Sequence, residues 1–156
     1  MEMKIGSFIV LIDADEWENV SRFHWHHNSS KIGGPYFRGW VKNIDGTRTH
    51  VYLHRFIINA PKEKHVDHIN GNTLDNRKIN LRLCFQIENC HNSKKSKKNT
   101  TGYKGVTYNK REKKYKAQIC LNWEHKCLGT FETAEEAYAA YCRAACEYYG
   151  QFARLF

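Results

Sequence analysis

The alternation of apolar and polar positions predicts most of the secondary structure of this chain. Residues 7–12 contain an apolar run at positions 8–12, which indicates a buried strand, and residues 15–24 indicate a short helix or turn. Further strands are expected at residues 36–41 and 49–53, on either side of an Asp-Gly turn, and at residues 80–85 ahead of a short helix. The first half of the chain is therefore expected to be rich in short strands.

The last third of the chain has the clearest pattern. It predicts strands at residues 104–108, 115–122 and 125–131, and apolar and polar residues alternate along the second of these. Thr133, with Glu136 three residues later, forms a capping box that opens a helix. The face of this helix that is expected to be core carries Ala134, Ala137, Tyr138, Tyr141, Ala145 and Tyr148. The pattern predicts an α+β fold in which the helix packs on a three-stranded antiparallel sheet.

A strong positive charge is concentrated in one stretch. The chain of 156 residues has a formal net charge of +9, and the stretch between His91 and Gln118 holds ten Lys or Arg against one acidic residue, so the rest is neutral. Such a stretch favours nucleic acid as the partner, because Lys and Arg that neutralise phosphates release counterions. A solvated linker would have the same composition, and residues 93–101 are expected to be both linker and contact to the DNA backbone. The lysines of this linker are Lys94, Lys95, Lys97 and Lys98.

The cysteines and the hydropathy of the sequence indicate the cellular compartment. The six cysteines form no Cys-x-x-Cys pair, and no apolar run is long enough to span a membrane. The sequence has no signal-peptide pattern, so we expect a cytoplasmic protein with reduced thiols and no membrane partner. A zinc site built from Cys84, Cys90 and His91 is a minor alternative.

The densest chemistry lies in residues 67–72, Asp-His-Ile-Asn-Gly-Asn, followed by Asn80 and Asn89. An imidazole beside a carboxylate can act as a general base, and carboxylate and amide oxygens are hard ligands for a cation such as Mg²⁺. The spacing leaves room for a hairpin loop, a short strand and the start of a helix, which would bring these residues together. The alternative is that the asparagines are only turn residues and His68 is an ordinary, partly buried histidine.

These residues resemble the motif of the His-Asn-His (HNH) endonucleases of the ββα-metal type, especially the phage and intron-encoded homing endonucleases. The matching positions are Leu53-His54-Arg55, His65-Val66-Asp67-His68-Ile69-Asn70-Gly71-Asn72, Asp75-Asn76, Asn80-Leu81-Arg82, Glu88-Asn89 and Asn92. The resemblance implies that His68 is the general base that activates water and that Asn80 orients its ring. It also implies that Asp67 and Asn89 hold one Mg²⁺ or Mn²⁺ in each active site.

The implied reaction is metal-assisted hydrolysis of a phosphodiester by water attacking in line, which leaves 5′ phosphate and 3′ hydroxyl ends. Some family members carry a third histidine where this chain has Asn89, so His91 is an alternative ligand. His54 is expected either to contact a phosphate or to support the catalytic residues. His24, His26 and His27 do not have the spacing of a known ligand set.

Residues 102–156 resemble a second family, the plant ethylene-response-factor (apetala-type) DNA-binding domain, which also occurs attached to HNH nucleases. The matching residues are Tyr103-Lys104-Gly105-Val106, Lys114-Tyr115-Lys116-Ala117-Gln118-Ile119, Leu128-Gly129-Thr130-Phe131, Thr133, Glu135-Glu136-Ala137, Ala139-Ala140-Tyr141, Ala144-Ala145, Gly150 and Ala153. The resemblance implies that the sheet lies in the major groove and the helix supports it from behind. By alternation, the exposed face of the sheet should carry Lys104, Thr107, Asn109, Lys116, Gln118, Cys120 and His125.

The plant domains use several arginines and tryptophans for DNA contacts, and this chain has other residues there, so their target sequence does not carry over. The replacements are Thr107, Asn109, Cys120 and Cys127.

Taken together, the sequence predicts a metal-dependent DNA endonuclease of phage or homing type. We expect a strand-rich segment at residues 1–48, an HNH module at 49–98 and a DNA-binding module at 99–156. The partner is double-stranded DNA, with no small-molecule substrate, in the cytoplasm of a bacterium or a phage-infected host. An inactive DNA-binding regulator and a zinc-stabilised nucleic-acid adaptor are the alternatives.

Overall fold

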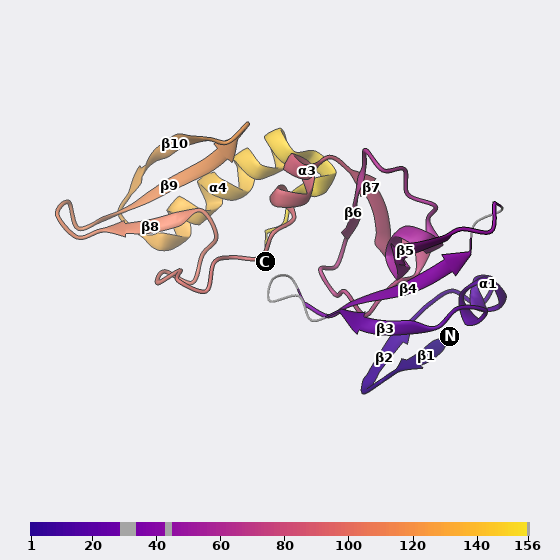
Figure 1. Ribbon diagram of the computed structural model, residues 1–156. Helices are drawn as coiled ribbons and strands as arrows, with labels where there is room; N and C mark the ends of the chain where they lie inside the picture. Colours follow the sequence, from indigo (N-terminus) through magenta and orange to yellow (C-terminus); the bar gives the residue numbers. More distant parts are fainter. Residues whose placement is uncertain (29–33, 43–44, 156) are drawn as a thin grey trace. The chain divides into compact units, whose positions relative to one another are not determined.

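The computed structural model describes residues 1–28, 34–42 and 45–155. Contacts between residues divide the chain into two compact units, Met1–Gln86 and Ile87–Phe156, and Figure 1 shows their elements. The strands and helices confirm the predicted α+β class. The predicted module boundaries after residues 48 and 98 differ from this division by contacts, and as functional boundaries they stay a prediction.

Small antiparallel sheets make up the described part of the N-terminal unit. One pairs β1 (Glu2–Ile5) with β2 (Phe8–Leu11), one has the order β3 (Trp25–Asn28), β4 (Tyr36–Lys42), β5 (Arg48–Tyr52), and one pairs β6 (His65–His68) with β7 (Leu81–Cys84). Short helices connect them: α1 (Trp17–Ser21), α2 (Leu53–Ile57) and the 3-10 turn η1 (Lys78–Asn80). The strands predicted at residues 7–12, 36–41, 49–53 and 80–85 are therefore present.

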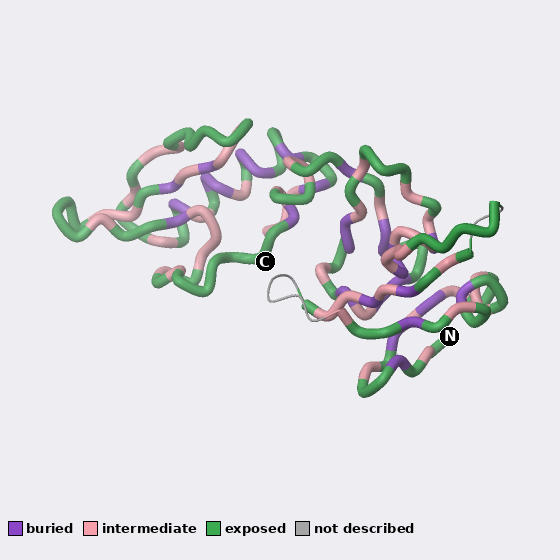
Figure 2. Tube along the Cα trace, in the orientation of Figure 1, coloured by how far each residue is buried: buried purple, intermediate pink, exposed green. Residues whose placement is uncertain are grey.

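A single hydrophobic core holds these sheets together. Its buried members come from every sheet and from both short α-helices: Ile5, Val10, Ile12, Val20, Trp25, Phe37, Leu53, Ile57 and Leu81. The Trp25 indole N–H donates to the Val20 carbonyl at 2.8 Å, so its polar atom is satisfied within the core. Figure 2 shows the buried positions running along the strands of this unit. The core fixes the β3-β4-β5 sheet, the β6-β7 hairpin and α2 in one arrangement.

Helix α3 (Gln86–His91) lies in the C-terminal unit except for its first residue. The unit also contains a sheet of order β10-β9-β8, with β8 (Val106–Asn109), β9 (Lys114–Leu121) and β10 (Glu124–Phe131). Helix α4 (Ala134–Tyr149) and the 3-10 turn η2 (Gly150–Phe152) follow. Ala117 and Ile119 of β9 are buried with α4 residues, whereas Lys116 is exposed, as alternation along an antiparallel strand requires. The predicted sheet and helix are confirmed.

The capping box at the start of α4 is confirmed as well. The Thr133 hydroxyl accepts from the Glu136 amide at 3.2 Å, and the Glu136 carboxylate accepts from the Thr133 amide at the same distance. The backbone of Gly105 has φ +75°, and a side chain there would collide with the buried Tyr141 ring, so glycine lets β8 approach the helix closely.

One residue of the predicted core stripe on α4 was assigned wrongly. Tyr148 is 42% exposed, and the neighbouring Tyr149 is 8% exposed and part of the core. The Tyr149 hydroxyl donates to the Cys120 carbonyl at 2.7 Å, and its ring stacks on His91 at 3.7 Å. These tertiary contacts decide which of the two tyrosines is buried.

Candidate active site

The β6-β7 hairpin positions the predicted catalytic pair. Asp67 and His68 are the last residues of β6, and their Cα partners on β7 are Arg82 and Leu81. Both residues are 5% exposed. A carboxylate and an imidazole held this deeply need specific partners, and the structure supplies a different one to each.

Asn80 closes the loop between the two strands. Its side-chain oxygen accepts from the Asn70 amide at 2.9 Å, and its side-chain nitrogen donates to the Asp75 carbonyl at 2.7 Å. The Ile69 amide also donates to the Asn80 carbonyl at 2.9 Å. Asn80 therefore fixes the backbone of the loop that follows His68, and any effect on the His68 ring passes through that loop.

The amide that faces the His68 ring is that of Asn76, which is fully buried. Its nitrogen donates to the Thr73 carbonyl at 3.1 Å, so its oxygen points at Nε2 of His68, 3.4 Å away. This geometry favours a proton on Nε2, which leaves the lone pair on Nδ1. A neutral imidazole in this tautomer can take a proton from water. The sequence placed Asn76 in the motif but gave it no role.

Aromatic side chains from three elements form one cluster with His68. The ring centroid of His54, on α2, is 5.4 Å from that of His68, and Tyr36, at the start of β4, is 6.2 Å from His68 and 5.4 Å from His54. Tyr52, at the end of β5, stacks on His54 at 5.5 Å. His54 is 8% exposed, so its position supports the predicted supporting role more than contact with a phosphate.

Burial shapes the protonation of this cluster. It lowers the pKa of His54 to about 3, with His68 and Arg55 acting in the same direction. Burial also lowers the pKa of His68, against the opposing effects of the Asn76 hydrogen bond and the Asp67 and Asp75 carboxylates. The pKa of Tyr36 is raised, first by burial and then by Asp67. The imidazoles are therefore neutral near pH 7.

Replacing His54 with phenylalanine should flatten the dependence of stability on pH. The pKa of His54 in the folded protein, about 3, lies below the usual value of 6.5. Between these two pH values His54 is therefore protonated in the unfolded chain and neutral in the folded one. The stability of the wild type is therefore present above pH 6.5 and is lost as the pH falls toward 3, by up to about 1.4 kcal/mol per pH unit for this group. Urea unfolding of both proteins between pH 4 and 8 measures the slope, and identical slopes would contradict the assignment.

Asp67 forms an ion pair with Arg82 across the hairpin. Nη2 and Nε of Arg82 lie 2.6 Å and 2.8 Å from Oδ2 of Asp67, and the two side chains are only 14% and 6% exposed. Breaking one member of such a buried pair leaves an uncompensated charge, so part of any effect of an Asp67 variant is structural.

The donor set fits the predicted cation in chemistry. Asp67 offers a carboxylate and Asn89 an amide oxygen, which suit Mg²⁺ or Mn²⁺ better than Zn²⁺. Asn89 is exposed on α3 and belongs to the C-terminal unit, so its pairing with Asp67 stays a prediction. Within the described residues, no three His, Cys, Asp or Glu side chains are grouped to hold a metal. This gives no support to the zinc alternative with Cys84, Cys90 and His91.

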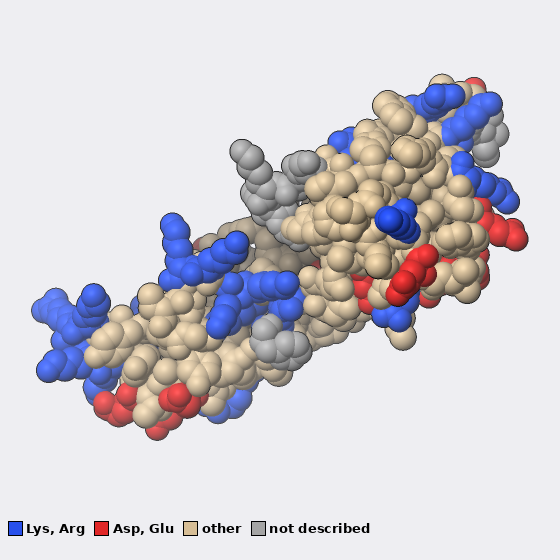
Figure 3. Space-filling model, turned by 90° about the horizontal axis from the view of Figure 1, so that it is seen from below, with Lys and Arg blue, Asp and Glu red and all other residues tan. Residues whose placement is uncertain are grey.

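In the C-terminal unit, the predicted linker is attached to the sheet. The Asn99 side chain accepts from the Gly102 amide and donates to the Tyr103 carbonyl, both at 2.7 Å, and Lys95 Nζ donates to the Gly102 carbonyl at 2.8 Å. Lys94, Lys97 and Lys98 are exposed. Figure 3 shows Lys and Arg side chains gathered on the face of this unit that it presents.

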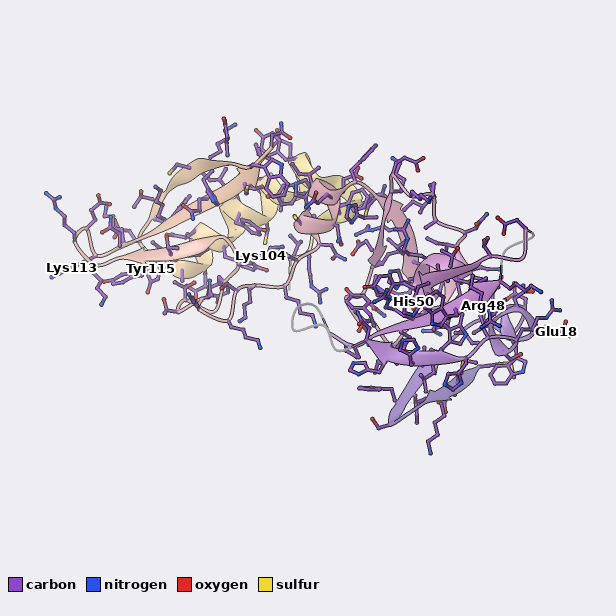
Figure 4. The ribbon with its side chains drawn as sticks, viewed as in Figure 1. Glu18, Arg48, His50, Lys104, Lys113 and Tyr115 are labelled. Atoms are coloured by element: carbon purple, nitrogen blue, oxygen red, sulfur yellow. The ribbon has the colours of Figure 1, made fainter. Side chains whose placement is uncertain are left out.

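The Lys104 side chain binds three backbone carbonyl groups. Its Nζ donates to the carbonyls of His91 at 2.9 Å, Ser93 at 2.7 Å and Arg154 at 3.3 Å. Burial, followed by repulsion from Arg154, lowers its pKa to about 8. The side chain is labelled in Figure 4. With its ammonium bonded to backbone carbonyls, Lys104 holds the linker in place, and the geometry does not favour the predicted contact with DNA.

The remaining predicted contacts lie on β8 and β9. Thr107 and Lys116 are exposed and are Cα partners on adjacent strands. Gln118 lines, with Thr107 and the linker residues 93–96, a groove of about 320 Å³. The Asn109 oxygen accepts from the amides of residues 111 and 112, at 3.1 Å and 3.4 Å, so it shapes the turn between the strands. Thr107, Lys116 and Gln118 thus share a polar surface beside the basic linker.

Sequence comparisons with known proteins match the part of the chain that contains the hairpin. The sequence profile of the HNH endonuclease family matches residues 51–89. An "Uncharacterized HNH endonuclease" of Acanthamoeba polyphaga mimivirus is 29% identical over 150 residues, which is 95% of this chain and 74% of that protein. "Protein 3.8" of Escherichia phage T7 is 34% identical over 95 residues, 61% of this chain and 78% of that protein. No solved structure matches.

The chain belongs to the HNH endonuclease family, whose members are phosphodiester hydrolases. HNH nucleases act on DNA and typically use one divalent metal ion. None of the helices in the described residues is long and apolar enough to cross a membrane.

Proposed function

We propose that the protein is a metal-dependent endonuclease that hydrolyses phosphodiester bonds of double-stranded DNA with His68 as the general base. The observation that carries this proposal is the placement of His68 on the β6-β7 hairpin: it is buried beside Asp67, and the Asn76 amide faces its Nε2. Burial lowers its pKa, which keeps the imidazole neutral at neutral pH and able to accept a proton.

Each of the candidate residues then has a part in the reaction. His68 accepts the proton of the attacking water, Asn76 holds the imidazole, and Asn80 fixes the loop that carries Asn76. Asp67 and Asn89 would hold one Mg²⁺ or Mn²⁺, which supplies positive charge to the phosphate oxygens and the 3′ leaving oxygen. His54 packs edge-on against the His68 ring.

For the C-terminal unit, we infer a role in target recognition. Its three-stranded sheet with one supporting helix has the element order expected for the ethylene-response-factor resemblance. The exposed Thr107 and Lys116, with Gln118 in the neighbouring groove, could reach base edges, while the linker lysines neutralise phosphates.

Incubation of the full chain with supercoiled plasmid, with and without Mg²⁺, tests the function. We expect conversion to nicked or linear DNA only with the metal, and products with 5′ phosphate ends that a ligase can seal. The absence of any cleavage in Mg²⁺ or Mn²⁺, with DNA still bound, would favour an inactive DNA-binding regulator.

Removing three linker lysines should weaken DNA binding in a salt-dependent way. Lys94, Lys97 and Lys98 are exposed, and Lys95 is left in place because it holds the Gly102 carbonyl. Each phosphate contact contributes about −0.9 to the log-log slope of affinity against salt, so the triple alanine variant should have a slope shallower by up to about 2.7. Sequence preference should not change, because phosphate contacts do not read bases.

The matched control for this variant removes three exposed charges from the N-terminal unit, Lys4, Arg22 and Lys62. Fluorescence anisotropy with one labelled duplex at 50 to 300 mM salt gives both slopes. Equal slopes for the two variants would mean that the lysine run is only a solvated linker.

A further inference from the structure

The outer face of the β3-β4-β5 sheet is a second polar surface in the N-terminal unit. Residues that alternate with the core positions Trp25, Phe37 and Val51 lie on this face. The outer face is defined here by His26, Arg38, Trp40, Lys42, Arg48 and His50. In Figure 4, Arg48 and His50 are labelled on β5.

The charged residues of this face are all cations. The three strands contain no Asp or Glu, and they contribute Arg38, Lys42 and Arg48. Lys42 and Arg48 are Cα partners, are exposed, and make no ion pair with any described residue. Like charges directly opposite each other lower the stability of a sheet, so a polyanionic partner would relieve a repulsion that the fold retains.

Exposed aromatic surface accompanies the charge. Trp40 is 56% exposed, and its ring stacks on His50 at 4.6 Å with an interplanar angle of 8°. His50 stacks in turn on His26 at 5.2 Å. Cations interleaved with stacked rings on an antiparallel sheet are the combination with which proteins hold nucleic acid strands.

Two polar atoms on this face lack a hydrogen-bond partner among the residues that the structure describes. Nε of Arg38 and Nε2 of His50 are buried, and neither makes a hydrogen bond with any described residue. The Arg38 guanidinium lies over the Tyr52 ring, 5.2 Å from its centroid. Buried polar groups are nearly always paired in folded proteins, so these two atoms leave hydrogen-bonding capacity of this face unused.

The outer face is continuous with the proposed active site. Arg38 and Tyr52 are Cα partners, and Tyr52 contacts Tyr36 at 6.2 Å between ring centroids. Tyr36 contacts His68 at the same centroid distance. We propose that the outer face binds the DNA strand next to the scissile phosphate, with Arg38, Lys42 and Arg48 on its phosphates and Trp40 stacked on a base. This inference rests on the proposed nuclease function for its substrate.

Two kinds of substitution in the full chain test the proposal in a His68→Ala background, where binding is measured without cleavage: loss of charge and loss of the indole ring. Lys42→Ala with Arg48→Ala should make the salt slope of duplex binding shallower by up to about 1.8. Trp40→Leu should weaken binding of single-stranded DNA by about 5- to 150-fold, and Trp40→Phe by less, because phenylalanine retains a ring that can stack. In the cleaving protein both changes should raise KM and leave kcat nearly unchanged.

The control for charge is Lys4→Ala with Arg22→Ala, which removes two exposed cations from β1 and the end of α1. The outer-face pair should lose more affinity than this control while its melting temperature stays equal or rises, since a repulsion is removed. Affinity and slope equal to those of the control, or a Trp40→Leu protein that binds like wild type, would overturn the proposal. Because binding is measured apart from cleavage, a wild type that fails to cut DNA would count against the nuclease function alone.

Discussion

Replacing His68 with alanine is expected to reduce plasmid nicking by about 10²- to 10⁴-fold, the usual contribution of a general base, while DNA affinity stays within a few fold of wild type. The imidazole is nearly buried and is held by Asn76, so it is placed to move a proton and adds little contact area for DNA. Single-turnover nicking at saturating Mg²⁺ measures the first quantity, and gel shift without metal measures the second.

A histidine three residues away provides the matched control. His65 lies on the same strand, at the other end of β6, and is exposed. His65→Ala should nick at the wild-type rate, because no ring contact or hydrogen bond among the described residues joins His65 to His68. If both variants lost activity equally, or if His68→Ala retained it, the general base would lie elsewhere. Imidazole added to the His68→Ala reaction should restore part of the rate.

Asn76→Ala offers a finer test of the same site. The loss of its amide should lower the rate less than loss of His68, since the imidazole remains but is no longer held in one orientation.

The sequence predicted the C-terminal sheet and helix well because half-buried strands alternate strictly and a capping box marks the helix start. It misassigned Tyr148 because two adjacent tyrosines at the end of a helix lie about 100° apart, and either can face the core. The bond from Tyr149 to the Cys120 carbonyl decides between them, and that carbonyl is far away in the sequence.

The N-terminal unit was harder to predict. Strand β3 begins with the buried Trp25 and continues as His-His-Asn, which has no apolar alternation to detect. The four-residue β1, which two residues join to β2, and the five-residue α2 are also too short for a periodic signal. Yet β3, β4 and β5 together create the outer face, whose charge and stacking arise only from the pairing of strands across the sheet.

At the active site, the motif placed Asp67 and His68 correctly side by side on a hairpin, but it could not say which amide faces the imidazole. Spacing within a motif identifies candidates, and the choice between Asn76 and Asn80 depends on how the loop folds back. Asn76 donates to Thr73 and Asn80 binds the backbone at both ends of its amide, bonds that no spacing rule contains.

Changing Asp67 and Asn89 is expected to alter the response to Mg²⁺ more than any other substitution in the chain. Asp67→Asn should abolish most nicking at low Mg²⁺, since an amide is a weaker ligand than a carboxylate for a hard cation. Asn89→Ala should raise the Mg²⁺ concentration for half-maximal rate, and high Mg²⁺ or Mn²⁺ should restore part of its activity. The rate of nicking as a function of metal concentration measures both effects.

The ion pair with Arg82 supplies the control that separates metal binding from folding. Arg82→Gln breaks the same buried pair and retains the Asp67 carboxylate, so its melting temperature should fall about as far as that of Asp67→Asn while its Mg²⁺ response persists. For Asn89, the control is Gln86→Ala, which removes an exposed amide from the same helix. Two outcomes would mean that Asp67 and Asn89 are structural residues: Arg82→Gln loses the metal response as fully as Asp67→Asn does, or the Asn89 and Gln86 variants behave alike.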